Sequence, residues 1–295
     1  MTIYSPKLLV TGGQGQLAAA IANHPLAKEF NVVLCSREEL DINQPASVEA
    51  EIAKHLPDII INTAAYTAVD KAEEEVSQAD RTNHIGTGQL ALLCHKHQIK
   101  LFHLSTDYVF DGIRTGKYLE DDVAAPLNIY GKSKWEGENE IRHTCKNHII
   151  LRVNAVFSEY GNNFLKSVLR LARERTSIRM VSDQITCPTY AGDIANAILM
   201  MCNAPSHKGT YHFCSAESVS WYEFAQAIIN EAKIHETLAV NVVTPISSEE
   251  FHAPAKRPAN SVLDCAKIKM TFDLNQPDWR AAMKRIIPKL IQEQA

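Results

Sequence analysis

The sequence lacks several features that would assign it to other classes of protein. It contains no apolar run close to the roughly 20 residues of a membrane-spanning helix. Residues 1 to 7 have neither the apolar segment nor the small-residue cleavage site of a signal peptide. The net charge of −4 provides no basic surface for nucleic acid or for an anionic membrane. We therefore expect no nucleic-acid partner and no membrane association.

The positions of the cysteines also give no sign of disulfide bonds. The seven cysteines are scattered along the chain, odd in number and without a C-x-x-C motif. Such an arrangement is typical of reduced thiols in a protein of the cytoplasm. The expected localisation is therefore cytoplasmic.

Apolar strands alternate with helical stretches over the first half of the chain, without an internal repeat or a low-complexity linker. Short apolar runs predict buried strands, and a doubly wound parallel sheet follows from their alternation with helices. We therefore predict an α/β, Rossmann-type fold. Asn43 is a plausible cap for the second helix. The predicted strands are 7–11, 31–35, 58–62, 100–104 and 149–153, and the predicted helices are 16–23, 47–56, 80–98 and 129–143.

The alternation loosens after about residue 155. Helices are predicted at 163–175, 193–203 and 221–232, the last capped by Ser220, with short strands near 211–213 and 241–243. We expect a dinucleotide-binding Rossmann domain over 1–154 and a smaller C-terminal lobe, mainly substrate-binding, over 155–295. The boundary is soft, and some later segments are expected to pack back on the first domain.

The turn after the first strand has glycine spacing suited to a nucleotide. Gly12 allows a tight turn, Gly15 lets the backbone approach a pyrophosphate, and the small Ala18 lets helix and strand pack closely. A glycine-rich turn without a ligand is the alternative. The position between the first strand and a helix favours nucleotide binding.

The end of the second strand lacks the acidic residue that an NAD site usually offers to the ribose 2′-hydroxyl. Ser36 and Arg37 occupy this position. Arg37 could pair with a 2′-phosphate, which favours NADPH over NADH, unless it is simply a solvated arginine.

Tyr130 and Lys134 are four residues apart, so in a helix the phenol and the ammonium share one face. A nearby positive charge lowers the pKa of a tyrosine toward the range of a proton donor at neutral pH. Thr106, at the end of a predicted strand, could hold a carbonyl oxygen from the other side. A surface pair at this spacing is the common alternative.

Together these motifs resemble the extended short-chain dehydrogenase/reductase family and, within it, the dTDP-4-dehydrorhamnose reductases. The resemblance covers almost the whole chain. Its most specific parts are the Thr106-Asp107-Tyr108-Val109-Phe110 block and the Arg257-Pro258 block, and it also includes 57–73, 125–134, 161–164 and 254–261.

The resemblance implies NADPH-dependent reduction of the C4 keto group of a dTDP-4-keto-6-deoxy sugar. The expected reaction converts dTDP-4-dehydro-L-rhamnose to dTDP-L-rhamnose for lipopolysaccharide O-antigen synthesis. Tyr130 would protonate the oxygen at C4, Lys134 would lower the pKa of Tyr130 and bind the nicotinamide ribose, and Thr106 would orient the oxygen. The implied substrate residues are Thr106, Asp107, Val69, Ala155 and Arg257. The implied cofactor residues are Gly12, Gly15, Gln16, Leu17, Ser36, Arg37, Asp41, Ile42, Ala64, Ala65, Tyr66, Thr67, Tyr130 and Lys134.

Two positions separate this chain from relatives. Dehydratases of the family have glutamate where Tyr108 stands, and tyrosine cannot replace that base near neutral pH. Ala155 stands where the family often has tryptophan, so the sugar could differ. The alternatives are a reductase of another dTDP-4-keto sugar, such as a dihydrostreptose-type sugar, and a non-catalytic, cofactor-binding regulatory subunit.

Some family members bind magnesium through glutamates at a dimer interface. The positions that align with two of them are Ala20 and Gly192, so the sequence does not support this metal. A homodimer remains open without it.

Overall fold

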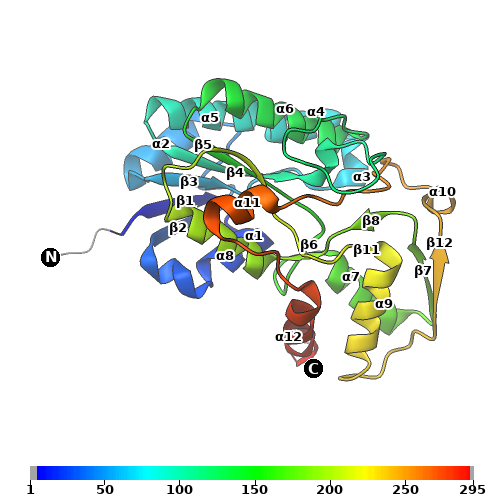
Figure 1. The fold of residues 1–295 in the computed structure, drawn as a ribbon. Helices are drawn as coiled ribbons and strands as arrows, with labels where there is room; N and C mark the ends of the chain where they lie inside the picture. The colour runs from blue at the N-terminus through cyan, green and yellow to red at the C-terminus, as the bar shows by residue number, and fades with distance from the viewer. Residues whose placement is uncertain (1–4, 293–295) are drawn as a thin grey trace.

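The computed structural model describes residues 5–292 and has the architecture of an α/β protein (Figure 1). Its central sheet has six parallel strands in the order β10-β5-β4-β3-β1-β2. This confirms the Rossmann-type doubly wound fold. The strands are β1 (Lys7–Thr11), β2 (Asn31–Cys35), β3 (Ile59–Asn62), β4 (Lys100–Thr106), β5 (His148–Val153) and β10 (Gly209–His212).

Helices cover both faces of this sheet, because successive strand residues point to opposite sides. Leu8 and Val10 belong to the core beneath one helical layer, whereas Leu9 belongs to the core beneath the other. Figure 1 shows the two layers above and below the sheet. One layer contains α1 (Gln16–Ala22), α8 (Ala191–Cys202) and α11 (Ala266–Phe272), and the other contains α2 (Pro45–His55), α5 (Thr87–Lys96) and α6 (Ile129–Thr144).

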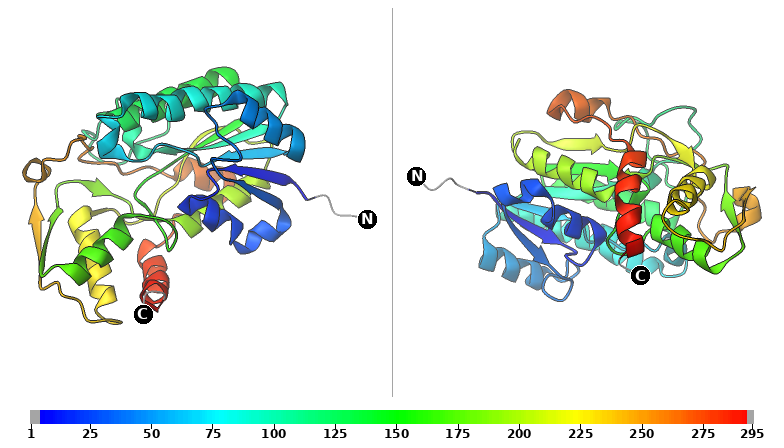
Figure 2. Two further views of the ribbon diagram at one scale, coloured as in Figure 1. Left: turned by 180° about the vertical axis from the view of Figure 1, so that it is seen from behind. Right: turned by 90° about the horizontal axis from the view of Figure 1, so that it is seen from below.

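A third hydrophobic core forms a C-terminal lobe beside the sheet (Figure 2). Phe224 and Trp279 are fully buried in it, with their rings 5.2 Å apart. Ser220 and Glu223 form a capping box at the start of α9, as the sequence predicts for Ser220. The lobe contains α7 (Phe164–Glu174), β7 (Ser177–Val181), α9 (Trp221–Ala232), β12 (Val242–Ile246) and α12 (Trp279–Gln292).

The chain passes between the two parts several times after residue 155. Strand β10 pairs with β5 at the edge of the main sheet, and α8 packs against α1. Several shorter elements lie elsewhere along the chain. They are α3 (Val69–Ala72), α4 (Val76–Asp80), β6 (Val156–Phe157), β8 (Ile185–Thr186), β9 (Thr189–Tyr190), β11 (Val219–Ser220), α10 (Ser248–Phe251) and the 3₁₀ turns Pro25–Glu29 and Asp107–Val109.

Two local predictions are wrong. The segment 80–98 is not one regular helix, because a π-helix (Arg81–Gly86) lies between α4 and α5. There the Asn83 carbonyl approaches α6 so closely that a Cβ on Gly137 would lie 2.1 Å away. Asn43 does not cap α2, since Gln44 occupies the cap position and the Asn43 amide instead donates to Asp41 at 2.8 Å.

Within residues 5–292 no helix is both long and apolar enough to cross a bilayer. All seven cysteines are buried free thiols.

Candidate active site

A cavity of about 840 Å³ lies between the C-terminal lobe and the carboxyl ends of the sheet strands. Ligands of open α/β sheets bind at this end of the strands. The cavity is lined both by residues that follow β3, β4 and β5 and by residues of the lobe. The predicted site residues in its lining are Gln16, Thr67, Val69, Thr106, Asp107, Tyr130, Ala155 and Arg257.

Tyr130 lies in the first turn of α6, which other parts of the chain hold in place. Asn128 caps this helix, with its Oδ1 accepting from the Gly131 amide at 2.7 Å. Glu73 accepts from the first amide of α6 at 2.9 Å. A Cβ on Gly131 would lie 2.2 Å from the Tyr108 carbonyl oxygen, so only glycine permits this contact. The helix start therefore places Tyr130 beside the end of β4.

The hydroxyl of Tyr130 shares a hydrogen bond with Thr106. Burial at the cavity wall raises the pKa of Tyr130 to about 12, the Thr106 bond acts in the opposite direction, and the nearby Asp107 raises it further. Tyr130 is therefore protonated at neutral pH and can serve as a proton donor.

Lys134, the residue expected to lower the pKa of Tyr130, lies one turn further along α6. Its ammonium nitrogen is buried and faces β4, where it contacts the Leu104 carbonyl oxygen at 2.7 Å and His103 Nε2 at 3.2 Å. Burial lowers the pKa of Lys134 to about 8, and Glu138 opposes this change. The strand backbone thus determines where the lysine points.

Asp107 is buried at the cavity wall, beside the reacting end of Tyr130. Thr106 donates to Asp107 Oδ1 at 3.0 Å. Burial raises the pKa of Asp107 to about 7, with Ser261 and Thr106 acting in the opposite direction. Its carboxylate oxygens are suitable acceptors for the hydroxyls of a sugar.

A buried ion cluster supports the wall from behind. Glu138 is fully buried and accepts from Arg152 Nη2 at 2.7 Å and from Ser105 at 2.5 Å, while Arg142 pairs with the same carboxylate. Although burial opposes ionisation, these partners lower the pKa of Glu138 to about 2. The cluster links α6 to β4 directly below the residues that line the cavity.

Arg257 lies in the cavity lining and is held in place by its neighbours. Its Nη2 donates to Asp70 Oδ2 at 2.8 Å, and its Nη1 donates to the Ala255 carbonyl oxygen at 3.2 Å. It also shares a hydrogen bond with Tyr108, whose ring packs edge-on against Tyr130. A diphosphate that binds at Arg257 would therefore meet a guanidinium already paired with Asp70.

The glycine turn provides an open backbone surface. Gly12 has φ = 66°, and a Cβ there would lie 3.0 Å from backbone atoms of Ala64. A Cβ on Gly13 would lie 2.9 Å from the backbone of Cys35. Gly15 begins α1 without a side-chain cap, and Leu17 is buried behind the turn. The turn therefore fits a dinucleotide pyrophosphate.

The residues after β2 lie in a separate polar turn. Ser36 follows the buried Cys35, and Arg37 is exposed to solvent. Asp41 Oδ1 accepts from the Asn43 backbone amide at 3.0 Å, so this carboxylate caps a turn. Ile42 is buried. Of these residues, Arg37 is the one whose charge is open to a 2′-phosphate.

Ala64, Ala65 and Tyr66 form the loop after β3, and a residue missed in the sequence holds this loop. Asn83, in the π-helix, accepts from the Tyr66 amide at 2.8 Å and donates to the Tyr66 carbonyl oxygen at 3.0 Å. It also donates to Ser133 of α6 at 3.0 Å. The sequence did not reveal the role of Asn83, because the helical pattern around it gave no sign of a π-helix.

The lobe contributes lining residues that the sequence gave no reason to select. Phe164 and Trp221 lie with their rings 4.6 Å apart, and Phe251 lines the cavity with half of its surface exposed. Arg179 adds a positive charge on the same side. Their elements are remote in sequence, so only folding brings them together.

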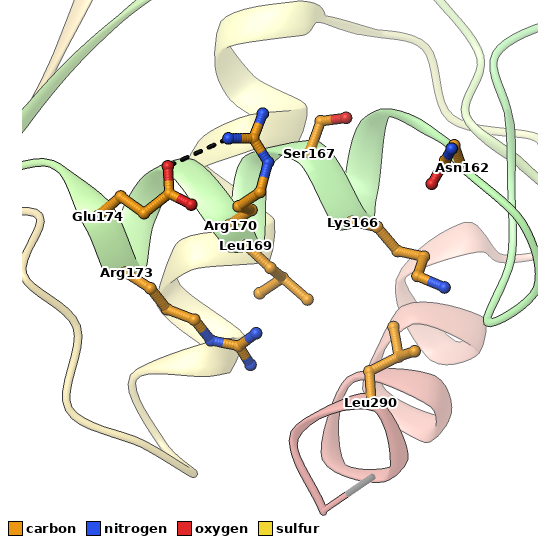
Figure 3. Close-up of a pocket in the computed structure, with 8 residues that line it drawn as sticks. All are labelled: Asn162, Lys166, Ser167, Leu169, Arg170, Arg173, Glu174 and Leu290. Atoms are coloured by element: carbon orange, nitrogen blue, oxygen red, sulfur yellow. Dashed lines mark hydrogen bonds and ion pairs between the residues drawn. The ribbon is translucent and has the colours of Figure 1, made fainter. Parts of the chain in front are cut away.

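A second cavity of about 420 Å³ lies along α7 (Figure 3). Its charged side chains interact with neighbours, as in the ion pair between Arg170 and Glu174 at 3.1 Å. None of the predicted site residues lines it. Among residues 5–292 no group of three or more His, Cys, Asp or Glu side chains is arranged to hold a metal ion.

Comparison with known proteins identifies the family of this chain. The family model described as the RmlD substrate-binding domain matches residues 6–292. A dTDP-4-dehydrorhamnose reductase of Aggregatibacter actinomycetemcomitans is 43% identical over 95% of this chain and 98% of its own length. The chain belongs to the RmlD family of dTDP-4-dehydrorhamnose reductases. The resemblance expected from the sequence is confirmed.

Solved structures of this RmlD family have the same fold. The dTDP-4-dehydrorhamnose reductase of Bacillus anthracis, solved in complex with NADP, superposes with a TM-score of 0.90 at 36% identity, covering 96% of this chain and 98% of that one. The orthologue from Clostridium acetobutylicum has a TM-score of 0.90 at 34% identity, covering 97% and 99%. Both the sheet and the lobe are therefore features of the family.

Proposed function

We propose that this protein is an NADPH-dependent reductase that converts the C4 keto group of dTDP-4-dehydro-L-rhamnose to the hydroxyl of dTDP-L-rhamnose. The observation that carries the proposal is the pairing of a protonated Tyr130 with Thr106 on the wall of a large cavity. Membership of the RmlD family supplies the substrate class.

The chain provides the proton for this reduction. NADPH, when bound, supplies the hydride. Tyr130 O–H donates its proton to the oxygen at C4 as negative charge develops there, and the Thr106 hydroxyl orients that oxygen. Asp107 accepts from sugar hydroxyls and thereby fixes which face of the ring is presented. Arg257 approaches the diphosphate of the substrate from the lobe side.

The proposed cofactor site extends from the glycine turn to the end of β2. Gly12 to Leu17 would hold the pyrophosphate, and Ala64 to Thr67 would follow the ribose side. Arg37 would pair with the 2′-phosphate, so Arg37→Ala should weaken NADPH binding about tenfold and NADH binding less than twofold. Fluorescence titration with both cofactors measures this, and equal losses would contradict the assignment.

A turnover assay tests the function directly. Purified protein is mixed with NADPH and with several enzymatically prepared dTDP-4-keto-6-deoxy sugars, and NADPH oxidation is followed. We expect turnover with dTDP-4-dehydro-L-rhamnose and a stoichiometric dTDP-L-rhamnose product. Faster turnover of another 4-keto sugar would favour the second candidate function, a reductase of a different dTDP-4-keto sugar. The observation that supports this candidate is Ala155, which lines the cavity and has φ = 42°.

The same assay distinguishes an enzyme from a regulatory subunit. A regulatory subunit would bind NADPH, oxidise none with any of these sugars, and change the kinetics of a partner enzyme. The presence of both Tyr130 and Thr106 at the cavity favours catalysis.

Two further properties belong to the same proposal. We propose action in the cytoplasm, supported by seven buried free thiols. We also propose a homodimer, held together without the magnesium site, since Ala20 and Gly192 offer no carboxylates. Analytical ultracentrifugation with and without a chelator tests the dimer.

A further inference from the structure

A buried chain of hydrogen bonds connects the first strand to Lys134. Thr11, Asn62 and His103 are each 0% exposed and lie on the adjacent strands β1, β3 and β4. Thr11 Oγ1 is 2.7 Å from Asn62 Oδ1, and Asn62 Nδ2 is 3.0 Å from His103 Nδ1. His103 Nε2 is 3.2 Å from Lys134 Nζ.

The donors and acceptors along this chain determine where the proton of His103 lies. Thr11 Oγ1 accepts from the Ala64 amide at 3.3 Å, so its own proton is directed to Asn62 Oδ1. Asn62 then presents its amide nitrogen, a donor, to His103 Nδ1. A neutral imidazole that accepts at Nδ1 holds its proton on Nε2, the nitrogen that faces Lys134.

The opposite orientation of the Asn62 amide fits less well. Thr11 would then receive two donors, from Asn62 and from the Ala64 amide, and Asn62 would not accept the Thr11 proton. The orientation in the structure gives each of these groups a matching role.

We propose that His103 is a positioning residue for Lys134, donating from its Nε2–H to the lysine amine and thereby favouring the neutral amine over the ammonium. An ammonium has no lone pair to accept this bond. The amine in turn donates to the Leu104 carbonyl oxygen at 2.7 Å. Lys134 is thereby fixed at one place below the cavity and exchanges protons near neutral pH.

The charges around this pair are consistent with a neutral imidazole. Burial, with Lys134, His148 and Arg142 nearby, holds the pKa of His103 well below its ordinary value. Burial also lowers the pKa of Lys134 to about 8, while Glu138, the anion that faces it, raises it. His103 is therefore uncharged across the pH range in which Lys134 titrates.

The position of the ring proton is the first test, because packing alone does not depend on it. Full-length protein labelled with ¹⁵N-histidine is studied by NMR at pH 9, above the Lys134 pKa of about 8, without cofactor or sugar, and His103 is assigned by the loss of its signals in His103→Asn. We expect a protonated Nε2 and an unprotonated Nδ1. A proton on Nδ1, or on both nitrogens, would overturn the proposal.

Two variants of His103 provide the second test. His103→Asn can replace Nδ1 and keep the contact with Asn62, but it is too short to reach Lys134. His103→Gln can replace Nε2 and reach Lys134. The titration of Lys134 is followed with ¹³Cε-labelled lysine, assigned through Lys134→Arg.

In His103→Asn the titration midpoint of Lys134 should rise by about one pH unit, because the neutral amine loses its donor. The kcat at pH 7 should fall about tenfold, with the KM for NADPH within about twofold of wild type. His103→Gln should restore at least half of both changes. An unchanged or lower midpoint in His103→Asn would overturn the proposal.

The inference rests on the proposed function only for its kinetic measurement. The two NMR measurements use neither sugar nor NADPH, so they remain decisive if the sugar reduction fails. If His103→Asn does not fold, the wild-type ¹⁵N measurement, assigned through His103→Gln, still decides between the two ring nitrogens.

Discussion

Two parts of the lining of the large cavity, Thr106–Asp107 on the sheet wall and Arg179 with Phe251 on the lobe wall, differ in how tightly their side chains are held. On the sheet wall, Thr106 and Asp107 are at most 6% exposed. On the lobe wall, the Arg179 side chain is 60% exposed, and its nearest carboxylate, that of Glu250, is 3.9 Å away and nearly as exposed. Phe251, on the same side, is 52% exposed.

This difference indicates that one wall carries out the proton transfer and the other binds the nucleotide sugar. A proton donor must be fixed to within a fraction of an ångström, and buried hydrogen bonds on regular elements provide that precision. Exposed side chains on short elements adjust to a ligand, since few contacts hold them. We infer that the sheet wall determines the rate of the reaction and the lobe wall the affinity for the nucleotide sugar.

The largest effect is expected at the proton donor. Tyr130→Phe should lower kcat by about 10³-fold, because a general acid contributes roughly 10² to 10⁴ and the hydroxyl is lost while the ring remains. Single-turnover NADPH oxidation measures the rate, and fluorescence titration should show unchanged NADPH binding. Tyr108→Phe, the matched control from the same wall, should lose less than tenfold. The reverse order would assign the donor to Tyr108.

The second largest effect is expected on the free energy of unfolding, at the buried ion cluster behind the sheet wall. Glu138→Gln leaves the buried Arg152 without its carboxylate partner, which costs about 3 to 5 kcal/mol when a buried pair is broken. Urea unfolding measures the loss. The exposed Glu140, half a turn away on α6, is the control, and Glu140→Gln should cost less than about 1 kcal/mol. Equal losses would mean that the cluster does not stabilise this wall.

The buried carboxylate of Asp107 should make stability depend on pH. Its pKa in the folded protein is about 7, above the ordinary 3.8, so its contribution is favourable below pH 3.8 and is lost as the pH rises through 7. The difference between the two pKa values corresponds to roughly 4 kcal/mol. We expect Asp107→Asn to recover about half of this free energy, so at pH 8 it should be more stable than wild type by about 2 kcal/mol. At pH 5 the gain should be smaller. Thermal unfolding at the two pH values measures it, and a gain independent of pH would contradict the assignment.

The smallest effect is expected on the lobe wall. Phe251→Ala should raise the KM for the sugar nucleotide about threefold and leave kcat within about twofold, since a half-exposed ring contributes modest apolar area. Met270→Ala, at an exposed site outside the cavity lining, should change neither value. A fall in kcat comparable to that of Tyr130→Phe would remove the distinction between the two walls.

Regular local patterns were predictable from the sequence. The strand 31–35 and the capped helix that begins at Trp221 agree with the structure residue by residue, because a short apolar run and a capping serine are local features. The π-helix at 81–86 was not predictable, since it depends on Asn83 meeting α6.

The candidate active site shows the same distinction between local patterns and long-range contacts. The sequence by itself determined the fold, the glycine turn, and the presence of Tyr130 and Lys134 on one helix, because each of these follows from composition and short-range spacing. Only the tertiary structure decided that Lys134 faces His103 and Leu104, and that Arg257 pairs with Asp70. Those contacts join residues that are distant in the chain, and burial and hydrogen-bond partners are properties of the packed molecule, which no local pattern contains.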